Sequence, residues 1–149
     1  KVAPPIRCKK DQKVLLDAVK SGLIDCIATD HAPHSIEDKE TDICNAACGM
    51  IGFETAFSIV SSTLLKEGMS INSIIDLFSF NPSNIIGIKP NSIKEGSDAE
   101  INIINLNKNW TFSEKHIQSK SKNTPLLGKK FNSKIEYTIN KGFISNHLE

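Results

Sequence analysis

The chain has 149 residues, of which 39% are hydrophobic and 23% are charged, and its formal net charge is +1. These values fit one globular domain, or one piece of a larger domain. The balanced charge gives no indication of nucleic acid or an anionic membrane as a partner, and the apolar stretches fall short of the roughly 18 residues that cross a bilayer. Four cysteines do not make a disulfide-rich secreted scaffold and predict a reducing, cytoplasmic setting.

The first half of the chain predicts helices around one buried strand. Apolar residues between Asp11 and Gly22 recur at helical spacing, which predicts an amphipathic helix that ends at Gly22. The nearly continuous apolar run 23–30 predicts a strand of a parallel sheet, buried on both faces. The polar, aperiodic stretch 35–47 predicts a surface loop, and the apolar residues of 50–68 predict a well-buried helix.

The second half of the chain changes from helix to strand. Ser70 is the predicted N-cap of a helix that runs to a break at Asn81-Pro82, and a short second helix follows as far as Gly87. The stretch 97–107 alternates in the manner of a strand. The stretch 133–146 carries two strand patterns separated by Asn-Lys-Gly, which predicts a hairpin.

The sequence CIATDHAPHS, residues 26–35, places polar side chains at the end of the predicted parallel strand. Ligands of parallel α/β folds bind outside the carboxyl ends of the strands. Asp30 at that end could hold a divalent metal and move a proton, and a proline-stiffened turn can bring His34 back over it, which suits metal-assisted hydrolysis. Two other interpretations stay open. Asp30 could cap the next segment beside ordinary loop histidines, or Cys44 and Cys48 could hold a structural zinc ion with the histidines.

Six stretches, in order along nearly the whole chain, resemble motifs of the dihydroorotases in the cyclic amidohydrolase superfamily. They are KVAPPIR (1–7), IDCIATDHAPHS (24–35), GMIGFETAFSIV (49–60), NPSNIIGI (81–88), IKEGSDAEINIINLN (93–107) and SKSKNTPLLGKKFNSKI (119–135). The Thr-Asp-His-Ala-Pro-His form resembles dihydroorotases rather than hydantoinases or allantoinase. The ordered set of motifs, more than any single one, indicates the family.

The resemblance implies an α/β fold, the C-terminal part of a TIM barrel followed by a small flanking β domain. Residues 1–90 would form the last part of the barrel and residues 91–149 the C-terminal β subdomain. It also implies the reversible, zinc-dependent hydrolysis of dihydroorotate to N-carbamoyl-aspartate in pyrimidine biosynthesis, at a site that holds two metal ions in the family.

The same resemblance implies roles for individual residues. By position, Asp30 contacts the catalytic metal and carries the proton. His34 helps to hold the carboxylate of the substrate, and the backbone of Cys48 and Gly49 contacts the pyrimidine ring. His31 belongs to the motif but is expected to support the loop rather than to bind metal.

Two departures from the family pattern bear on activity. Ala3 stands where the usual Lys-x-Asn-Pro-Pro segment has the Asn that contacts substrate. The His-x-His pair and the other metal ligands of the family are absent from the sequence, and a TIM barrel needs about 250 residues. We therefore expect residues 1–149 to be the C-terminal third of a dihydroorotase, inactive alone, whose parent forms a homo-oligomer or associates with aspartate transcarbamoylase. The alternative, which Ala3 favours, is an inactive dihydroorotase-like protein that serves as a structural partner of that transcarbamoylase.

Other conspicuous residues have structural interpretations. Trp110 and Phe112 are predicted to pack within the β portion of the chain. The basic stretch 119–125 predicts a solvated loop, with phosphate binding as the other interpretation. His116 and His147 are predicted at the surface.

Overall fold

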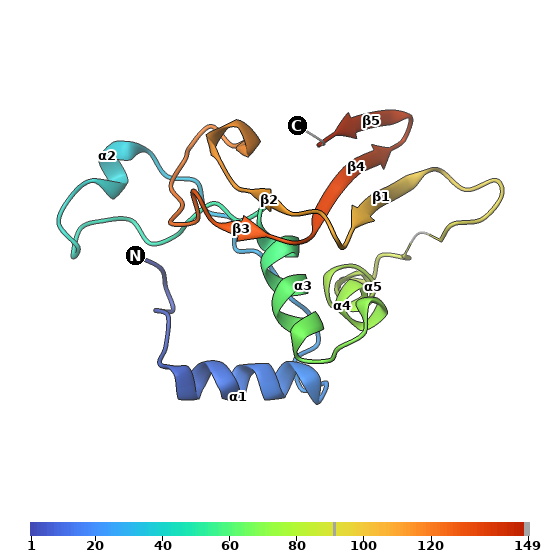
Figure 1. The fold of residues 1–149 in the computed structure, drawn as a ribbon, viewed down its shortest axis with the longest axis horizontal. Coiled ribbons are helices and arrows are strands. Elements are labelled where there is room, and N and C mark those ends of the chain that lie inside the picture. Colours follow the sequence, from blue (N-terminus) through green and yellow to red (C-terminus); the bar gives the residue numbers. More distant parts are fainter. Residues whose placement is uncertain (91, 148–149) are drawn as a thin grey trace.

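The computed structural model describes residues 1–90 and 92–147, and it is an α/β arrangement in which helices precede strands (Figure 1). The helices are α1 (Lys9–Lys20), α2 (Ile36–Lys39), α3 (Ala56–Lys66), α4 (Ile71–Phe78) and α5 (Phe80–Ile85), and the strands are β1 (Glu100–Asn105), β2 (Trp110–Thr111), β3 (Lys130–Phe131), β4 (Lys134–Asn140) and β5 (Phe143–Asn146). One antiparallel sheet has the order β1–β4–β5, and β2 pairs with β3 in a second. No helix in the described ranges is long and apolar enough to cross a membrane.

Helices α1 and α4 form where the sequence predicts them. Helix α1 is followed by Gly22 at φ +77°, a conformation that glycine adopts without a steric cost. The Ser70 hydroxyl accepts a hydrogen bond from the Ser73 N–H at 3.1 Å, which confirms Ser70 as the N-cap of α4. The predicted break is misplaced, because α4 ends before Ser79 and α5 continues through Pro82. Proline is tolerated there because the first turn of a helix needs no N–H donor at that position.

The run 23–30 is not the buried strand that its apolar character predicts. It forms no ladder with any described segment, and Leu23 is 78% exposed. Its contacts include hydrogen bonds from the Ile27 N–H to the Leu77 carbonyl at 2.9 Å and from the Asn81 amide to the Asp25 carbonyl at 2.8 Å. Just beyond the run, His31 and Met50 form an isolated parallel bridge. A parallel strand takes its hydrogen bonds from neighbouring strands, and the described residues place none beside this run.

The segment before helix α3 is also not helical. The helix begins at Ala56 rather than at residue 50, because the N–H groups of Gly52 and Phe53 are directed to the imidazole of His31. The predicted loop 35–47 contains the short helix α2, whose first turn is capped by the Ser35 hydroxyl. Both differences come from side-chain to main-chain hydrogen bonds that hydrophobic periodicity does not record.

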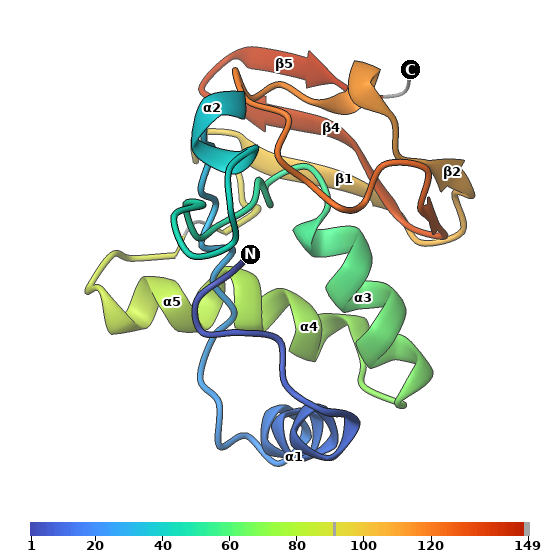
Figure 2. The same cartoon turned by 90° about the vertical axis from the view of Figure 1, so that its left-hand side faces the viewer.

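The buried apolar side chains of the described residues gather in two clusters, one between α3 and α4 and one around β2 and β3. Helix α3 lies beside both sets of elements (Figures 1 and 2). The first is centred on the buried side chains of Leu64, Ile74 and Leu77, from α3 and α4. The second contains the buried rings of Phe112 and Phe131 beside half-buried Trp110, which confirms the predicted packing of Trp110 and Phe112. The predicted hairpin also forms, between β4 and β5.

Candidate functional site

Asp30 lies at the end of the apolar run in a left-handed backbone conformation, with φ +46°. Such a conformation costs a non-glycine residue about 1–2 kcal/mol, and aspartate is among the residues that tolerate it best. The side chain is exposed, and its carboxylate makes no hydrogen bond or ion pair with the described residues. A strained backbone that presents a free carboxylate is a candidate functional position.

His31, the next residue, is fixed by the main chain opposite it. Its Nδ1 accepts hydrogen bonds from the N–H groups of Gly52 at 3.0 Å and Phe53 at 3.2 Å. Its ring also stacks on the Phe53 ring, with centroids 4.0 Å apart and planes within 5°. Because Nδ1 acts as an acceptor, the proton of the neutral ring is on Nε2. These contacts agree with the supporting role expected for His31.

His34 lies against the segment Cys48–Gly49. Its Nε2 is 3.0 Å from the Cys48 carbonyl oxygen, and since a carbonyl can only accept, Nε2 carries the proton. Gly49 has φ +134°, and a Cβ at this position would lie 2.5 Å from the Cβ of Ala32 and 3.1 Å from Nε2 of His34. The close approach of the two segments therefore requires glycine at position 49.

Lys39 holds the same segment from the other side. Its Nζ donates to the carbonyl oxygens of Ala47 at 2.8 Å, Gly49 at 2.9 Å and Lys1 at 3.4 Å. The Gly49 N–H in turn donates to the Lys1 carbonyl at 2.9 Å. Three main-chain carbonyls thus converge on one half-buried ammonium group, which fixes the path of the chain around Gly49.

Asn123 joins the C-terminal half of the chain to this motif. Its Oδ1 accepts from the His34 N–H at 3.1 Å, and its Nδ2 donates to the carbonyls of Ala32 at 2.9 Å and Gly49 at 3.3 Å. Its own carbonyl accepts from the Ile51 N–H at 3.1 Å. The stretch 119–125, predicted as a solvated loop, therefore carries a half-buried residue that links both halves of the candidate site.

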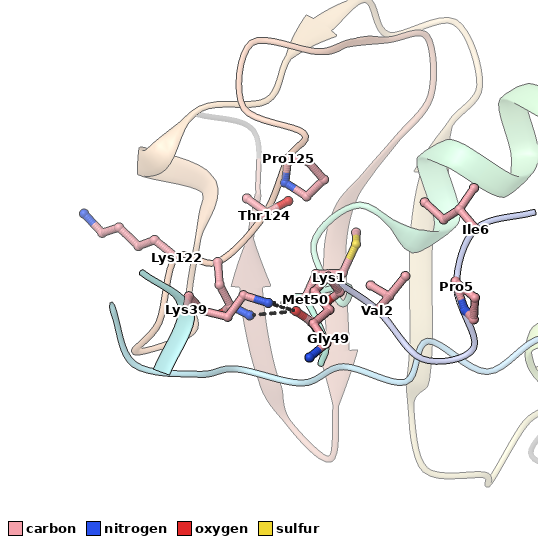
Figure 3. Close-up of a pocket in the computed structure, with 11 residues that line it drawn as sticks. Lys1, Val2, Pro5, Ile6, Lys39, Gly49, Met50, Lys122, Thr124 and Pro125 are labelled. Carbon is pink, nitrogen blue, oxygen red and sulfur yellow. Dashed lines mark hydrogen bonds between the residues drawn. The ribbon is translucent and has the colours of Figure 1, made fainter. Parts of the chain in front are cut away.

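A cavity of about 710 Å³ lies beside Gly49 and Lys39. Its walls are Lys1, Val2, Pro5, Ile6, Lys39, Gly49, Met50, Lys122, Asn123, Thr124 and Pro125. Figure 3 shows the amine of Lys39 directed at Gly49, whereas the side chain of Lys122 points away from both. Lys122 instead pairs with Glu114 at 2.6 Å. The lining thus combines apolar side chains with three lysines.

The predicted site residues do not all meet at one point. His34, Cys48 and Gly49 are in mutual contact, and Gly49 lines the cavity. Asp30 lies outside the residues that line it. Lys39 and Asn123 were not predicted as site residues. Asn123 lies within the motif stretch 119–135 and Lys39 within the predicted loop 35–47, and the site partners of both are main-chain groups, which leave no pattern in the sequence.

The described residues supply too few side chains for a complete metal site. No group of three or more His, Cys, Asp or Glu side chains that could hold a metal ion is present in residues 1–90 and 92–147. His31 and His34 each use one ring nitrogen on the main chain, and the cysteines are free thiols. Of the predicted site residues, Asp30 can contribute one carboxylate ligand. Zinc usually needs three or four protein ligands. The alternative zinc site at Cys44 and Cys48 is not assembled.

Comparison with known proteins identifies relatives over almost the whole chain. Residues 7–144 match the model of the amidohydrolase family. The dihydroorotase of Caldicellulosiruptor saccharolyticus is 46% identical over 145 residues, which cover 97% of this chain and 34% of the relative. The dihydroorotase of Elusimicrobium minutum is 44% identical over 140 residues, which cover 93% of this chain and 32% of the relative. The chain spans about a third of the length of these curated relatives.

Solved structures of cyclic amidohydrolases share the fold. A D-hydantoinase (dihydropyrimidinase) from Thermus sp. is similar with a TM-score of 0.85 at 24% identity, over 98% of this chain and 33% of that one. An L-hydantoinase (dihydropyrimidinase) from Arthrobacter aurescens has a TM-score of 0.85 at 25% identity, over 100% of this chain and 35% of that one. The similarity covers helices and strands together.

Proposed function

This chain belongs to the amidohydrolase family, and from that premise we propose that it forms the C-terminal part of a dihydroorotase. The reaction is the reversible hydrolysis of dihydroorotate to N-carbamoyl-aspartate, in pyrimidine biosynthesis. Two relatives that carry the name dihydroorotase, at 46% and 44% identity, support this choice within the family. Since the chain spans about a third of their length, the activity is proposed for the whole protein.

The proposed architecture is a TIM barrel with a flanking β subdomain. Residues 1–90 belong to the end of the barrel in this proposal, and residues 91–149 to the β subdomain. The family match and the hydantoinase-like fold support it. The unpaired run 23–30 is also consistent with it, because the run has the composition of a strand with neighbours on both sides.

The observation that carries the proposal is the position of Asp30. Its side chain is exposed and makes no hydrogen bond or ion pair with the part of the chain that the structure describes, and its backbone is left-handed at the end of the apolar run. We assign it two tasks: it contacts a divalent metal ion, zinc in the proposal, and it takes up and returns a proton during hydrolysis. When bound, the metal supplies Lewis-acid polarisation of the scissile amide. The other metal ligands lie outside residues 1–149 in this proposal.

Substrate binding is assigned to His34 and to the segment Cys48–Gly49. The ammonium of Lys39 beside Gly49 adds positive charge where an anionic substrate would bind. In the structure, the Nε2–H of His34 is directed to the Cys48 carbonyl. A substrate carboxylate would have to replace this bond or use the other ring nitrogen of His34.

Replacing Asp30 by Asn in the whole protein tests the proposal. The amide keeps the size of the side chain and its tolerance for the left-handed conformation, but it can no longer take up a proton. We expect the rate of dihydroorotate hydrolysis to fall about 100-fold to 10,000-fold, with little change in the melting temperature. Asp25→Asn is the matched control, because Asp25 is exposed in the same segment and is assigned no role.

Equal activity of Asp30→Asn and Asp25→Asn would contradict the assignment. If the unmodified whole protein does not hydrolyse dihydroorotate, the alternative function gains support: an inactive dihydroorotase-like subunit that binds aspartate transcarbamoylase. Ala3 favours that alternative, since it lacks the amide of the asparagine expected there. An Ala3→Asn variant that regains hydrolysis would show that only a substrate contact is missing. Co-purification with the transcarbamoylase, without regained hydrolysis, would support the inactive structural partner.

A further inference from the structure

A second cavity, of about 470 Å³, lies between the first turn of helix α3 and the strands. Residues of α3, β2 and β4 contribute to its walls, among them Phe57, Ser58, Trp110 and Lys134. The cavity also contains Lys115, His116 and His147, so basic side chains outnumber acidic ones in its walls. None of these residues has a part in the proposed hydrolysis.

Lys134 is the least ordinary of these side chains, because it is only 6% exposed and no ion pair within residues 1–90 and 92–147 includes it. Its Nζ lies 5.2 Å from the centroid of the Trp110 ring, a cation–π contact that compensates part of the lost hydration. The nearby carboxylate of Glu136 accepts a hydrogen bond from Asn105 at 3.0 Å. A buried lysine is normally paired with a carboxylate.

The surroundings of Lys134 add positive charge. Burial lowers the pKa of its ammonium group, and the positive charges of Lys108 and Lys115 lower it further, against a smaller opposite effect of Glu136. His116 responds in the same direction, because burial and then the charge of Lys134 lower its pKa. These basic groups thus repel one another, and Glu136 offsets the repulsion at Lys134 only in part.

His116 also presents a donor. Its Nδ1 accepts hydrogen bonds from the N–H and the hydroxyl of Ser113, both at 3.0 Å. The proton of the neutral ring is therefore on Nε2. No hydrogen bond from this Nε2 to another described residue is present, so an acceptor near Lys134 could also reach it.

We propose that this cavity binds an anionic group, a carboxylate or a phosphate, that serves as the counter-ion of Lys134. The anion lies near Lys134 and His116, with Lys115 contributing long-range attraction. Two sources share this chemistry: a free small anion, or an acidic side chain of polypeptide outside residues 1–149. A buried ion pair of this kind is stable when both charges are also hydrogen-bonded.

Glu54 fixes a second feature of the occupant. Its Oε1 accepts from the N–H groups of Gln118 at 3.1 Å and Ser119 at 3.3 Å, while its Oε2 is buried without a partner among the described residues. Glu54 lines the same cavity, and no ion pair among the described residues joins it to Lys134. An occupant with anionic oxygens for Lys134 and a donor proton for Oε2 of Glu54 would satisfy both side chains. Hydrogen phosphate is such a group.

Thermal unfolding of the whole protein in inorganic phosphate tests the proposal. The variants are Lys134→Met, which removes the charge, and Lys134→Arg, which keeps it. Lys129→Met is the matched control, because Lys129 is an exposed lysine outside the cavity. At constant ionic strength set with chloride, we expect phosphate to raise the melting temperature of the unmodified protein and of Lys129→Met by several degrees, saturably. Lys134→Met should need at least tenfold more phosphate, and Lys134→Arg should respond in part.

The second source gives a different result. If an acidic side chain of the polypeptide already pairs with Lys134, phosphate changes no melting temperature, but Lys134→Met alone lowers it by several degrees, because a buried carboxylate loses its partner. The proposal is wrong if phosphate has no effect and Lys134→Met melts at the same or a higher temperature than the unmodified protein. Removing an uncompensated buried charge has that effect.

Discussion

The ring of His116 meets the edge of Trp110, with centroids 4.9 Å apart, and approaches Phe112 as well. Its prediction as a surface residue was wrong in this respect, because the side chain is half-buried. Burial lowers its pKa below the ordinary value of 6.5, and the positive charge of Lys134 and then that of Lys115 act in the same direction, against the hydrogen bond with Ser113. The folded state therefore favours the neutral ring.

Acidification should destabilise the protein through His116. Because the pKa is lower in the folded state, the unfolded state binds more protons below about pH 6.5, and stability falls as the pH drops through this window. The loss levels off below the pKa of the folded state. Urea unfolding of the unmodified protein and of His116→Asn, whose amide oxygen can still accept from Ser113, measures the effect. We expect the difference in free energy of unfolding to change between pH 7.5 and pH 5; a constant difference would contradict the prediction.

Single residues also show how far the sequence could predict the candidate site. Asp30 and His34 were predicted as site residues because catalytic chemistry uses few residue types and the motif places them together, and their roles stay predictions. Lys39 and Asn123 were not, since lysine and asparagine in polar stretches usually face solvent. Asn123 is 89 residues from His34 along the chain, and its partners are main-chain atoms that have no pattern in the sequence.

At the scale of elements, the turn that presents Gly49 depends on side chains rather than on a regular element. Lys39, the last residue of the four-residue helix α2, provides the common donor for three carbonyls around it. The prediction of 35–47 as a loop was therefore incomplete. So short a helix has little stability of its own, and tertiary hydrogen bonds determine whether it forms.

Lys39→Met should loosen this turn. Methionine keeps the apolar stem of the side chain but leaves the carbonyls of Ala47 and Gly49 without their charged donor. We expect the free energy of unfolding to fall by about 2 kcal/mol and the amide of Gly49 to exchange faster with solvent. The control is Lys122→Met, because the Lys122–Glu114 pair has both side chains 60% exposed and should contribute less than about 1 kcal/mol. If both variants lose the same free energy of unfolding in urea, the three hydrogen bonds of Lys39 contribute no more than an exposed ion pair does.

Strand β1 forms within the predicted stretch 97–107 although its partner β4 is distant in the sequence, but other elements that followed the prediction are stabilised by local contacts. Helix α1 and the β4–β5 hairpin depend on periodicity and on turn residues, and Lys141 and Gly142 in that turn have φ values of +47° and +88°. The run 23–30 depends instead on neighbouring strands, which its own sequence cannot supply. Its apolar composition indicates a buried environment, and the described residues do not provide that environment around Leu23.

At the scale of the whole molecule, helix α3 connects the two apolar clusters. One face of the helix carries Leu64 toward α4. Along the same buried stripe, toward the start of the helix, lie Ser58 and Ser61, whose hydroxyls bond the carbonyl and the hydroxyl of Ser133, each at 2.7 Å. Ser61 and Ser133 are 0% and 1% exposed, so these bonds have no water to replace them. Small polar residues let the helix approach the strands closely, and they couple the helical part to the β part.

This coupling predicts one cooperative unfolding transition that both clusters control. Ile74→Ala removes a fully buried side chain from the first cluster, and Phe112→Ala removes one from the second. Each should lower the melting temperature of the same transition by about 10 °C, given a cost of about 3 kcal/mol for either cavity. Ile93→Ala and Phe143→Ala, at side chains that are 86% and 80% exposed, are the matched controls and should change it little. Calorimetry that resolved two transitions, one sensitive to Ile74 alone and one to Phe112 alone, would show that Ser58 and Ser61 do not couple the clusters, and the helical and β parts would then unfold as separate units.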